Sequence, residues 1–378
     1  MSDRLRLSIL SFSPLHRDPR VLRQIRLFAG DYAVTTVGFG PSPDPRVTHV
    51  RLPDGARAWP SHKLFLLARA HRRTYGSIPA VSAARAALAG HEADIVLAND
   101  VNTLPLAAEL APRLGIHADL HEYSPREKEH DVRWRLVVGP FMRWICRTYL
   151  PRVASITTVS PGLAAEYARE FGVRCEVVLN APARADIAPR PTAEPLRLIH
   201  TGVARANRSL EVMIEAVRDL EHLTLDFMLV ESEPGVIDDL RRRAEGLEHV
   251  RFRAPVPFDE IVPTLATYDA SLVFFPPTTF NLRHTLPNKL FEAVQARGAL
   301  VVSPSPDMAD LVREYGIGVV AEGFTPGALA EALSSLSPER VDAYKRASNL
   351  AAATLNAETQ AHGWVRALDA LASGKGPA

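Results

Sequence analysis

The chain has 378 residues, of which 47% are hydrophobic and 23% charged, and its formal net charge is +1. This length exceeds what one ordinary hydrophobic core holds, so we expect two globular domains and exclude a disordered or fibrous protein. Its two cysteines, Cys146 and Cys175, exclude a disulfide framework, and no Cys/His cluster indicates a metal site.

Targeting signals are not evident in the sequence. The opening stretch, MSDRLRLSILSFSP, has an apolar run only as long as a strand, without the longer apolar region and cleavage site of a signal peptide. No apolar run approaches the ~18 residues that a membrane span needs. We therefore expect a cytoplasmic protein.

In the first half, short β-branched runs alternate with amphipathic stretches, which is typical of parallel βαβ units. The predicted strands are 5–12, 33–38, 94–99, 117–122 and 154–160. The predicted helices include 19–30, 103–114 and 161–172. Asp18 followed by Pro19 predicts a capping carboxylate at the start of the first of these helices.

The alternation stops at 181–195, where four prolines and no apolar period predict a linker. It then restarts, with predicted strands at 196–202, 223–230, 249–254, 270–275, 299–303 and 317–322. Helical patterns follow at 207–220 and 287–297, and a long one covers 338–372. We predict an α/β protein with doubly wound parallel-sheet domains at 1–185 and 186–350, and a C-terminal helix in 351–378 that crosses back to the first domain.

The strongest pattern for chemistry is HTLPNKLFEAVQARGALVVS at 284–303. Pro287 suits the first turn of a helix, which leaves the N–H groups of Asn288 and Lys289 free to bind an anion. Glu292 follows one turn later, where its carboxylate can accept hydrogen bonds from the two hydroxyls of a ribose.

This block resembles the donor-binding segment of family 4 glycosyltransferases, which often reads PNKLFEYLAAGLPVV. The resemblance implies the GT-B fold, with two Rossmann-like domains facing across a cleft, and a donor site that includes Leu286, Pro287 and Asn288. It also implies that Glu292 holds the nucleotide ribose. The family carries another glutamate eight residues upstream of this one, and here that position is His284. Either His284 contacts the sugar or a phosphate, or it is a loop histidine.

A second segment, LIHTGVARANRSLEVMIEAV at 198–217, begins with a strand and reaches Gly202, which lets the chain leave the strand tightly. Arg208 lies beside the expected helix N-terminus and suits a diphosphate. The segment resembles the family's G-x-x-x-x-x-(K/R)-G-L block, whose basic residue binds the donor diphosphate. Ser209 replaces the usual glycine, and Val203 stands where many members carry arginine, so Arg205 is a substitute candidate.

A third segment, DIVLANDVNTLPLAAELAPRLGIHADLHEYSPRE at 94–127, resembles the family's DIVHAHDLDTLPLA…YDAHEYFPE sequence. The resemblance implies that His121 lies near the donor sugar. Together with Arg208 and Lys289, this histidine is our candidate for a catalytic role. Asp100 and Glu122, at the carboxyl ends of predicted strands, are weaker candidates for binding the acceptor.

Weaker resemblances cover most of the rest of the chain. The segment SFSPLHRDPR suggests that Arg17 and Arg20 face the cleft, and Arg17 is our candidate for the acceptor. The segment FRAPVPFDE resembles the family's stretch around the nucleotide base, where Val256 offers backbone contacts.

Charge is distributed unevenly, with 25 Lys and Arg against 17 Asp and Glu in residues 1–185, and 19 against 26 in the remainder. Residues 132–152 interleave five arginines with four aromatic residues. That pattern suits a peripheral contact with the inner face of a membrane, an anionic acceptor, or a packed helix at the domain edge. Nothing further in the sequence indicates nucleic acid.

The resemblance implies a retaining, metal-independent transfer of a hexose-like sugar from a nucleoside diphosphate to an acceptor hydroxyl, without a cofactor. The acceptor is unidentified, with a lipid-linked or an anionic molecule as the candidates. The alternatives are a catalytically silent glycosyltransferase-like binding subunit and a GT-B sugar-nucleotide epimerase. The chain has no Asp-x-Asp, G-x-G-x-x-G or Walker-type sequence, which argues against a metal-bridged transferase, a dehydrogenase and an ATPase.

Overall fold

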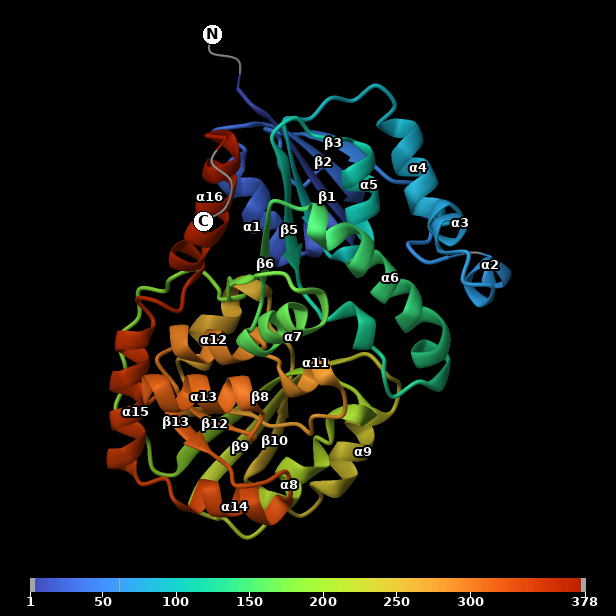
Figure 1. Ribbon diagram of the computed structural model, residues 1–378. Coiled ribbons are helices and arrows are strands. Elements are labelled where there is room, and N and C mark those ends of the chain that lie inside the picture. Colours follow the sequence, from blue (N-terminus) through green and yellow to red (C-terminus); the bar gives the residue numbers. More distant parts are fainter. Residues whose placement is uncertain (1–3, 61, 375–378) are drawn as a thin grey trace. The chain divides into compact units, whose positions relative to one another are not determined.

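The computed structural model describes residues 4–60 and 62–374, and the chain divides into two compact units (Figure 1). The first unit comprises Met1–Val178, Thr279–Asn281 and Ala361–Ala378, and the second comprises Leu179–Thr278 and Leu282–Gln360. Each unit is built on its own sheet, in which every strand pair is parallel.

The sheet of the first unit has seven strands in the order β3-β2-β1-β4-β5-β6-β7. Its strands are β1 (Arg6–Pro14), β2 (Ala33–Phe39), β3 (Thr48–Arg51), β4 (Ile95–Asn99), β5 (Gly115–Leu120), β6 (Ser155–Thr158) and β7 (Glu176–Val177). The strand order reverses between β1 and β4, and ligands of doubly wound sheets bind at the carboxyl ends of the strands beside such a point.

Helices cover both faces of this sheet (Figure 1). They are α1 (Pro19–Phe28), α2 (Lys63–Leu67), α3 (His71–Gly76), α4 (Pro79–Ala87), α5 (Leu104–Glu109), α6 (Gly139–Tyr149), α7 (Pro161–Phe171) and α16 (Ala357–Ala372). Because successive strand residues point to opposite faces, Ile95 and Leu97 pack with α1 and α16, whereas Val96 and Ala98 pack with α4, α5 and α6. The predicted cap is confirmed, since the Asp18 side chain accepts a hydrogen bond from the Val21 N–H at 3.2 Å.

The second unit has a six-stranded sheet in the order β10-β9-β8-β11-β12-β13. Its strands are β8 (Leu196–Ala204), β9 (Leu223–Glu231), β10 (Val250–Arg253), β11 (Ala270–Val273), β12 (Ala299–Val302) and β13 (Gly318–Val320). Its helices are α8 (Glu211–Val217), α9 (Val236–Arg243), α10 (Ile261–Leu265), α12 (Asn288–Gln295), α13 (Pro306–Tyr315), α14 (Pro326–Ser334) and α15 (Pro338–Ala351), and α11 (Phe280–Arg283) contributes residues to both units. The strand order reverses between β8 and β11.

Two cores lie on opposite faces of this second sheet. One core includes Val301 with residues of α8, α9 and α14. The other includes Leu300 and Val302 with α12, α13 and α15. The apolar positions of α12 bury Leu290, Phe291 and Val294 in the second of these cores, which fixes the helix against the sheet. Its first turn therefore has a defined position.

The predicted linker at 181–195 is a packed segment of the second unit, and the boundary between the units falls after Val178, not after residue 185. The segment has no regular secondary structure, but side chains at the C-terminal end of α12 and just after it bind the segment by hydrogen bonds. Gln295 Oε1 accepts from the Ala185 N–H at 3.0 Å, and the Arg297 guanidinium donates to the Ala185 carbonyl at 2.8 Å. Local proline content does not reveal such hydrogen bonds from residues 110 positions away.

The long helical pattern predicted at 338–372 is interrupted between α15 and α16. Gln295 Nε2 donates to the carbonyls of Ala352 and Leu355, at 3.0 and 2.8 Å. Asn356 then caps α16, with its Oδ1 accepting from the Thr359 N–H at 2.8 Å. Further along α16, Trp364 and Leu368 are buried in the first unit. Within residues 4–60 and 62–374, no helix has the length and apolarity to cross a membrane.

Candidate functional site

Gly202 and Lys289 lie close together in the second unit. Gly202 lies near the carboxyl end of β8 with φ of +148°, a conformation that side-chain-bearing residues rarely adopt. A Cβ built at this position would lie 2.5 Å from Lys289 Nζ. The absence of a side chain at Gly202 thus makes room for the ammonium group.

Lys289 enters this space from the first turn of α12. Pro287 is the N-cap residue, with φ −73° and ψ 151°, so the helix begins at Asn288, one residue later than predicted. In the described part of the chain, the backbone N–H groups of Asn288 and Lys289 have no backbone acceptor, as expected at a helix start. The Asn288 side chain accepts from Asn180 Nδ2 at 2.7 Å, and Leu286 is buried in the core, so these two side chains support the turn.

The Lys289 ammonium lies in a positive environment. Burial, followed by the nearby charge of Arg208, lowers the pKa of Lys289 to about 8, and the charge of Glu292 only partly opposes this. Among the residues that the structure describes, none accepts a hydrogen bond from Lys289 Nζ or forms an ion pair with it within 4.0 Å. An ammonium group in this position is suited to an anion from outside the chain.

Glu292 lies one turn after Lys289 on the same helix and is 7% exposed. Burial raises the pKa of the Glu292 carboxyl group, and the Lys289 charge partly offsets that effect. No hydrogen-bond donor within the described residues reaches this carboxylate. Because a buried carboxylate needs donors, its oxygens are suited to ligand hydroxyls.

Arg208 and Phe275 meet where the strand order reverses. Arg208 ends a 3₁₀ turn after β8, Phe275 follows β11, and the guanidinium carbon lies 5.4 Å from the ring centroid. Ser209, which stands where the family carries glycine, has φ of +49°. The glycine-type backbone conformation is therefore kept although the glycine is not. Arg205 does not join this group, since its Nε donates to Ser232 Oγ at 3.2 Å beyond the end of β9.

Two further predicted residues lie in loops of the second unit. His284 Nδ1 is 3.4 Å from Asp307 Oδ1, in the first turn of α13, and the side chains are 19% and 8% exposed. Sequence reasoning missed Asp307, whose only signal is its place just after a predicted strand. Val256 lies after β10 and packs, half-buried, in a small cluster with Ile199, Met228 and Leu265.

His200 is another residue that the sequence analysis missed. It is 2% exposed in β8, and its Nδ1 lies 2.8 Å from the Leu272 carbonyl oxygen, to which it donates. Nε2 is then an acceptor, and it lies 3.9 Å from the Cβ position built at Gly202. Burial and the charge of Lys289 hold the pKa of His200 well below its ordinary value, so the ring is neutral. The signal in the sequence was a histidine two residues before the strand glycine.

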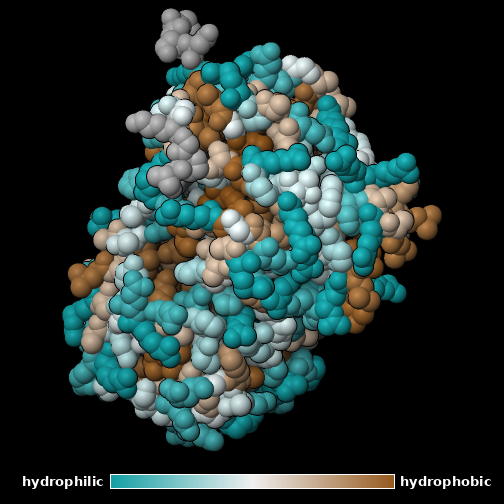
Figure 2. Space-filling model, viewed as in Figure 1, coloured by the Kyte–Doolittle hydropathy of each residue, from teal (hydrophilic) through white to brown (hydrophobic). Residues whose placement is uncertain are grey.

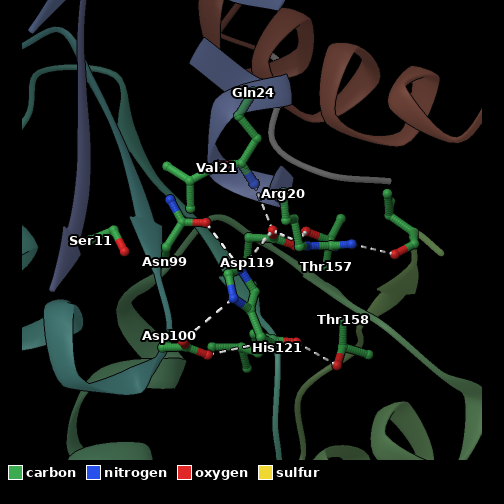
Figure 3. Close-up of polar contacts among 12 residues, drawn as sticks. Ser11, Arg20, Val21, Gln24, Asn99, Asp100, Asp119, His121, Thr157 and Thr158 are labelled. Atoms are coloured by element: carbon green, nitrogen blue, oxygen red, sulfur yellow. Dashed lines mark hydrogen bonds and ion pairs between the residues drawn. The ribbon is translucent and has the colours of Figure 1, made fainter. Parts of the chain in front are cut away.

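In the first unit, Figure 3 shows Asn99, Asp100 and Asp119 converging on His121. His121 directly follows β5, and Asn99 and Asp100 lie at the end of the neighbouring β4. His121 Nε2 is 3.2 Å from Asn99 Oδ1 and 3.3 Å from Asp119 Oδ2, while Nδ1 is 3.5 Å from Asp100 Oδ2. The backbone N–H of His121 also donates to Asp100 Oδ1 at 2.9 Å.

The two carboxylates determine the charge of His121. Burial alone would lower the pKa of this imidazole, but the charge of Asp100 and the hydrogen bond to Asp119 outweigh burial and raise it to about 9. His121 is therefore an imidazolium at neutral pH, with one-fifth of its side chain exposed. It can stabilise negative charge or donate a proton, but it cannot act as a base while it is charged.

Asp119 accepts hydrogen bonds from two other elements, α1 and β6, and this corrects the prediction for Arg20. Arg20 does not face a cleft: it is 2% exposed and binds both Asp119 oxygens at 2.7 Å. Gln24 and Thr157 donate to the same carboxylate at 2.6 Å each. Burial would raise the pKa of Asp119, but the Arg20 charge and the hydrogen bonds hold it well below its usual range. Asp119 is thus ionised, and its carboxylate contacts His121.

The remaining predicted residues of the first unit are more exposed. Arg17 is exposed in the 3₁₀ turn Leu15–Arg17 that follows β1. Glu122 is also exposed, and its backbone carbonyl accepts from Tyr167 Oη at 2.7 Å. Asp100, Glu122 and Arg17 therefore lie near the carboxyl ends of β4, β5 and β1.

Two parallel sheets with helices on both faces, each with a reversal in strand order, are the architecture of the GT-B fold, and comparisons with solved structures bear this out. Sucrose-phosphate synthase from Thermosynechococcus elongatus is 13% identical, with 98% of this chain and 100% of that chain covered and a TM-score of 0.73. The UDP-forming α,α-trehalose-phosphate synthase from Burkholderia vietnamiensis is 12% identical over 99% and 100%, with a TM-score of 0.71. HepE from Anabaena, solved with UDP-glucose, is 13% identical over 97% and 100%, with a TM-score of 0.69.

Residues 195–338, which make up most of the second unit, match the family described as Glycosyl transferases group 1. No curated protein matches the chain in sequence. The predictions of the GT-B fold and of a glycosyltransferase are confirmed at the level of fold and family. The individual site residues stay predictions.

Proposed function

We propose that the protein transfers a hexose-type sugar from a nucleoside-diphosphate sugar to an acceptor hydroxyl, with retention of anomeric configuration and without a metal. The observation that carries this proposal is the first turn of α12. There a half-buried ammonium, Lys289, and a buried carboxylate, Glu292, lie one turn apart, and neither has a direct counter-charge within 4.0 Å among the described residues. A nucleoside diphosphate supplies an anion for the first and a ribose diol for the second.

The remaining donor contacts follow from the same arrangement. Arg208 and the free amide groups at the start of α12 would bind the diphosphate with Lys289. Gly202 would admit the phosphates close to the backbone, with Pro287, Asn288 and Leu286 holding the turn. His284 would contact the sugar, and Val256 the base. HepE was solved with UDP-glucose and the Burkholderia synthase is UDP-forming, so a uridine donor is the first to test.

Catalysis would be electrostatic. Cations and oriented amides stabilise the leaving diphosphate as its charge develops, so no protein nucleophile is needed. His121 would contribute as an imidazolium in the first unit, for which we propose acceptor binding through Asp100, Glu122 and Arg17. The excess of basic residues in this unit suits a lipid-linked or anionic acceptor. A cytoplasmic location, with peripheral contact to the inner membrane face through 132–152, belongs to the same proposal.

The decisive test is thermal unfolding of the purified full chain with a panel of nucleoside diphosphates and their sugars, without added metal. A ligand at ~100 times its dissociation constant stabilises by about 2.7 kcal/mol. We expect one nucleoside diphosphate to raise the melting temperature, and Arg208→Ala or Glu292→Gln to abolish the rise. Glu331→Gln, on the exposed side of α14, is the matched control and should keep it.

The outcomes separate the alternatives. No shift with any nucleotide would reject the donor site. Binding without hydrolysis or transfer would favour a silent binding subunit, and epimerisation of the bound sugar without transfer would favour an epimerase. If transfer occurs, NMR of the product linkage tests retention, and an inverted product would reject that part of the proposal.

A further inference from the structure

Exposed hydrophobic side chains gather in one region of the first unit. The described residues include nine exposed large hydrophobics, and five of them come from two segments near α2 and the π-helix η4 (Trp134–Val138). These five are Trp59, Leu64, Leu67, Val132 and Leu136. Leu64 is 78% exposed and Leu136 is 66% exposed, so neither contributes to the core. Figure 2 shows hydrophobic residues at the right-hand edge of the view, where Figure 1 places α2.

The two segments form one surface, which we call the α2–η4 surface. The rings of Trp59 and the buried Trp134 pack in a T-shaped arrangement with centroids 5.4 Å apart, and α2 contacts η4 directly. Leu66 points inward and packs against the core of the unit. Because α2 is anchored by this inward residue, Leu64 and Leu67 are held outward in the folded chain.

The α2–η4 surface is bordered by positive charge. Its exposed arginines are Arg69, Arg72, Arg73, Arg133 and Arg135. None of them forms an ion pair within 4.0 Å among the described residues. The nearest acidic residue in sequence, Asp131, accepts the backbone N–H groups of Arg133 and Trp134 instead. Apolar side chains with a basic border and no counter-charge are complementary to an anionic, partly apolar surface.

Most of the segment 132–152 contributes little to such a surface. Phe141, Ile145 and Cys146 are at most 1% exposed, and Trp144 packs against the same core. Only the beginning of the segment, around η4, presents exposed apolar residues. The sequence analysis named the whole segment 132–152, whereas the exposed apolar residues lie at its start and in α2, which the sequence analysis did not name.

We propose that the α2–η4 surface docks on a bilayer that contains anionic phospholipid. Leu64, Leu67 and Leu136 would enter the boundary between headgroups and acyl chains, and the arginines would contact the phosphates. The inference rests on the peripheral membrane contact through 132–152 that we proposed with the function. It places the centre of that contact at α2. It is independent of the donor site, because all of its residues belong to the first unit.

The test is sedimentation of the full chain with vesicles of phosphatidylcholine alone and of phosphatidylcholine mixed with phosphatidylglycerol. We expect binding to the mixed vesicles only, and weaker binding as salt is added. Leu64→Ser/Leu67→Ser and Arg72→Gln/Arg73→Gln should each lower the partition coefficient by about tenfold or more. The matched control, Val230→Ser/Leu350→Ser, removes two apolar side chains that are also more than half exposed, from the second unit, and should bind like wild type.

Three outcomes would overturn the proposal: no binding to mixed vesicles, equal binding by the leucine variant, or a dimer in size exclusion that the leucine variant converts to a monomer. Nucleoside-diphosphate binding is measured on the same samples in solution. Lost vesicle binding with retained nucleotide binding rejects only the docking surface, whereas lost nucleotide binding with retained vesicle binding rejects only the donor site. The exposed positions of all substituted side chains predict unchanged melting temperatures, which we would check first.

Discussion

Arg20 and Asp119 form a buried two-point ion pair in the first unit, with the Nε and terminal nitrogen of Arg20 each 2.7 Å from an Asp119 oxygen. Trp364 of α16 lies against the guanidinium, 4.8 Å from ring centroid to Cζ. The pair thus connects α1, β5 and α16, and it fixes the position of the carboxylate that contacts His121.

Asp119→Asn should therefore destabilise the fold by about 3–5 kcal/mol, because it leaves the Arg20 charge buried without its partner. Denaturant unfolding measures the change. Asp310→Asn removes the carboxylate of an exposed pair with Arg313 and should stay within about 0.5 kcal/mol. Equal effects of the two substitutions would contradict a special contribution from burial.

Asp100→Asn should lower the pKa of His121, since the Asp100 charge is the largest contribution that raises it. NMR titration of the histidine ring gives the value directly, and Glu122→Gln, next to His121 but exposed, should change it less. A pKa raised from 6.5 to about 9 stabilises the fold fully below pH 6.5, and this contribution is lost as pH rises through 9. An unchanged titration in Asp100→Asn would reject our account of the imidazolium.

Nucleoside-diphosphate affinity should fall above pH 8, because the free Lys289 amine is neutral there and the bound anion requires the ammonium. One linked proton gives at most about a tenfold loss per pH unit, and phosphates are already ionised above about pH 7. Calorimetry across pH 7 to ~10 measures the slope. Lys289→Met should bind more weakly at neutral pH and show no such slope. For folding the sign is opposite, since the lowered pKa makes this group's contribution to stability rise between pH 8 and 10.5.

Gly202→Ala should weaken nucleotide binding by about tenfold or more. The new methyl group would occupy the space of the Lys289 ammonium at a strained φ of +148°. The lysine can move aside, so we expect only about 1–3 kcal/mol of lost stability. Gly327→Ala, in α14 with nothing within 4 Å of its Cβ position, is the control and should leave binding unchanged. Retained affinity in Gly202→Ala would place the anion elsewhere.

Ser209→Gly should stabilise the second unit by about 1 kcal/mol, because Ser209 adopts φ of +49°, where a side chain is unfavourable. Thermal unfolding reports the gain. Ser232→Gly, which removes a hydroxyl that accepts from Arg205 and donates to the Ala204 carbonyl, should destabilise instead. Destabilisation by Ser209→Gly would mean that the serine hydroxyl makes a contact that offsets the strain.

Local patterns predicted the α/β fold and most strands of both sheets because burial in a parallel sheet leaves runs of apolar residues that need no knowledge of the partner strand. The Asp18 cap and the glycine at the end of β8 were also predictable, because each depends only on residues next to it in the chain. β3 and α2 were missed. Their sequences, THVR and KLFLL, are short and carry no clear period.

The sequence by itself determined the resemblance of residues 195–338 to group 1 glycosyl transferases, the two-sheet architecture and the first turn of α12, because these depend on residues close together in the chain. Only the tertiary structure decided how the long-range partners are paired. Arg20 is bound to a carboxylate 99 positions away, Gln295 ties down the proline-rich segment, and Leu64 is exposed although it is hydrophobic. Such pairings arise when folding brings distant segments together, and a local pattern contains no information about which distant group a side chain will meet.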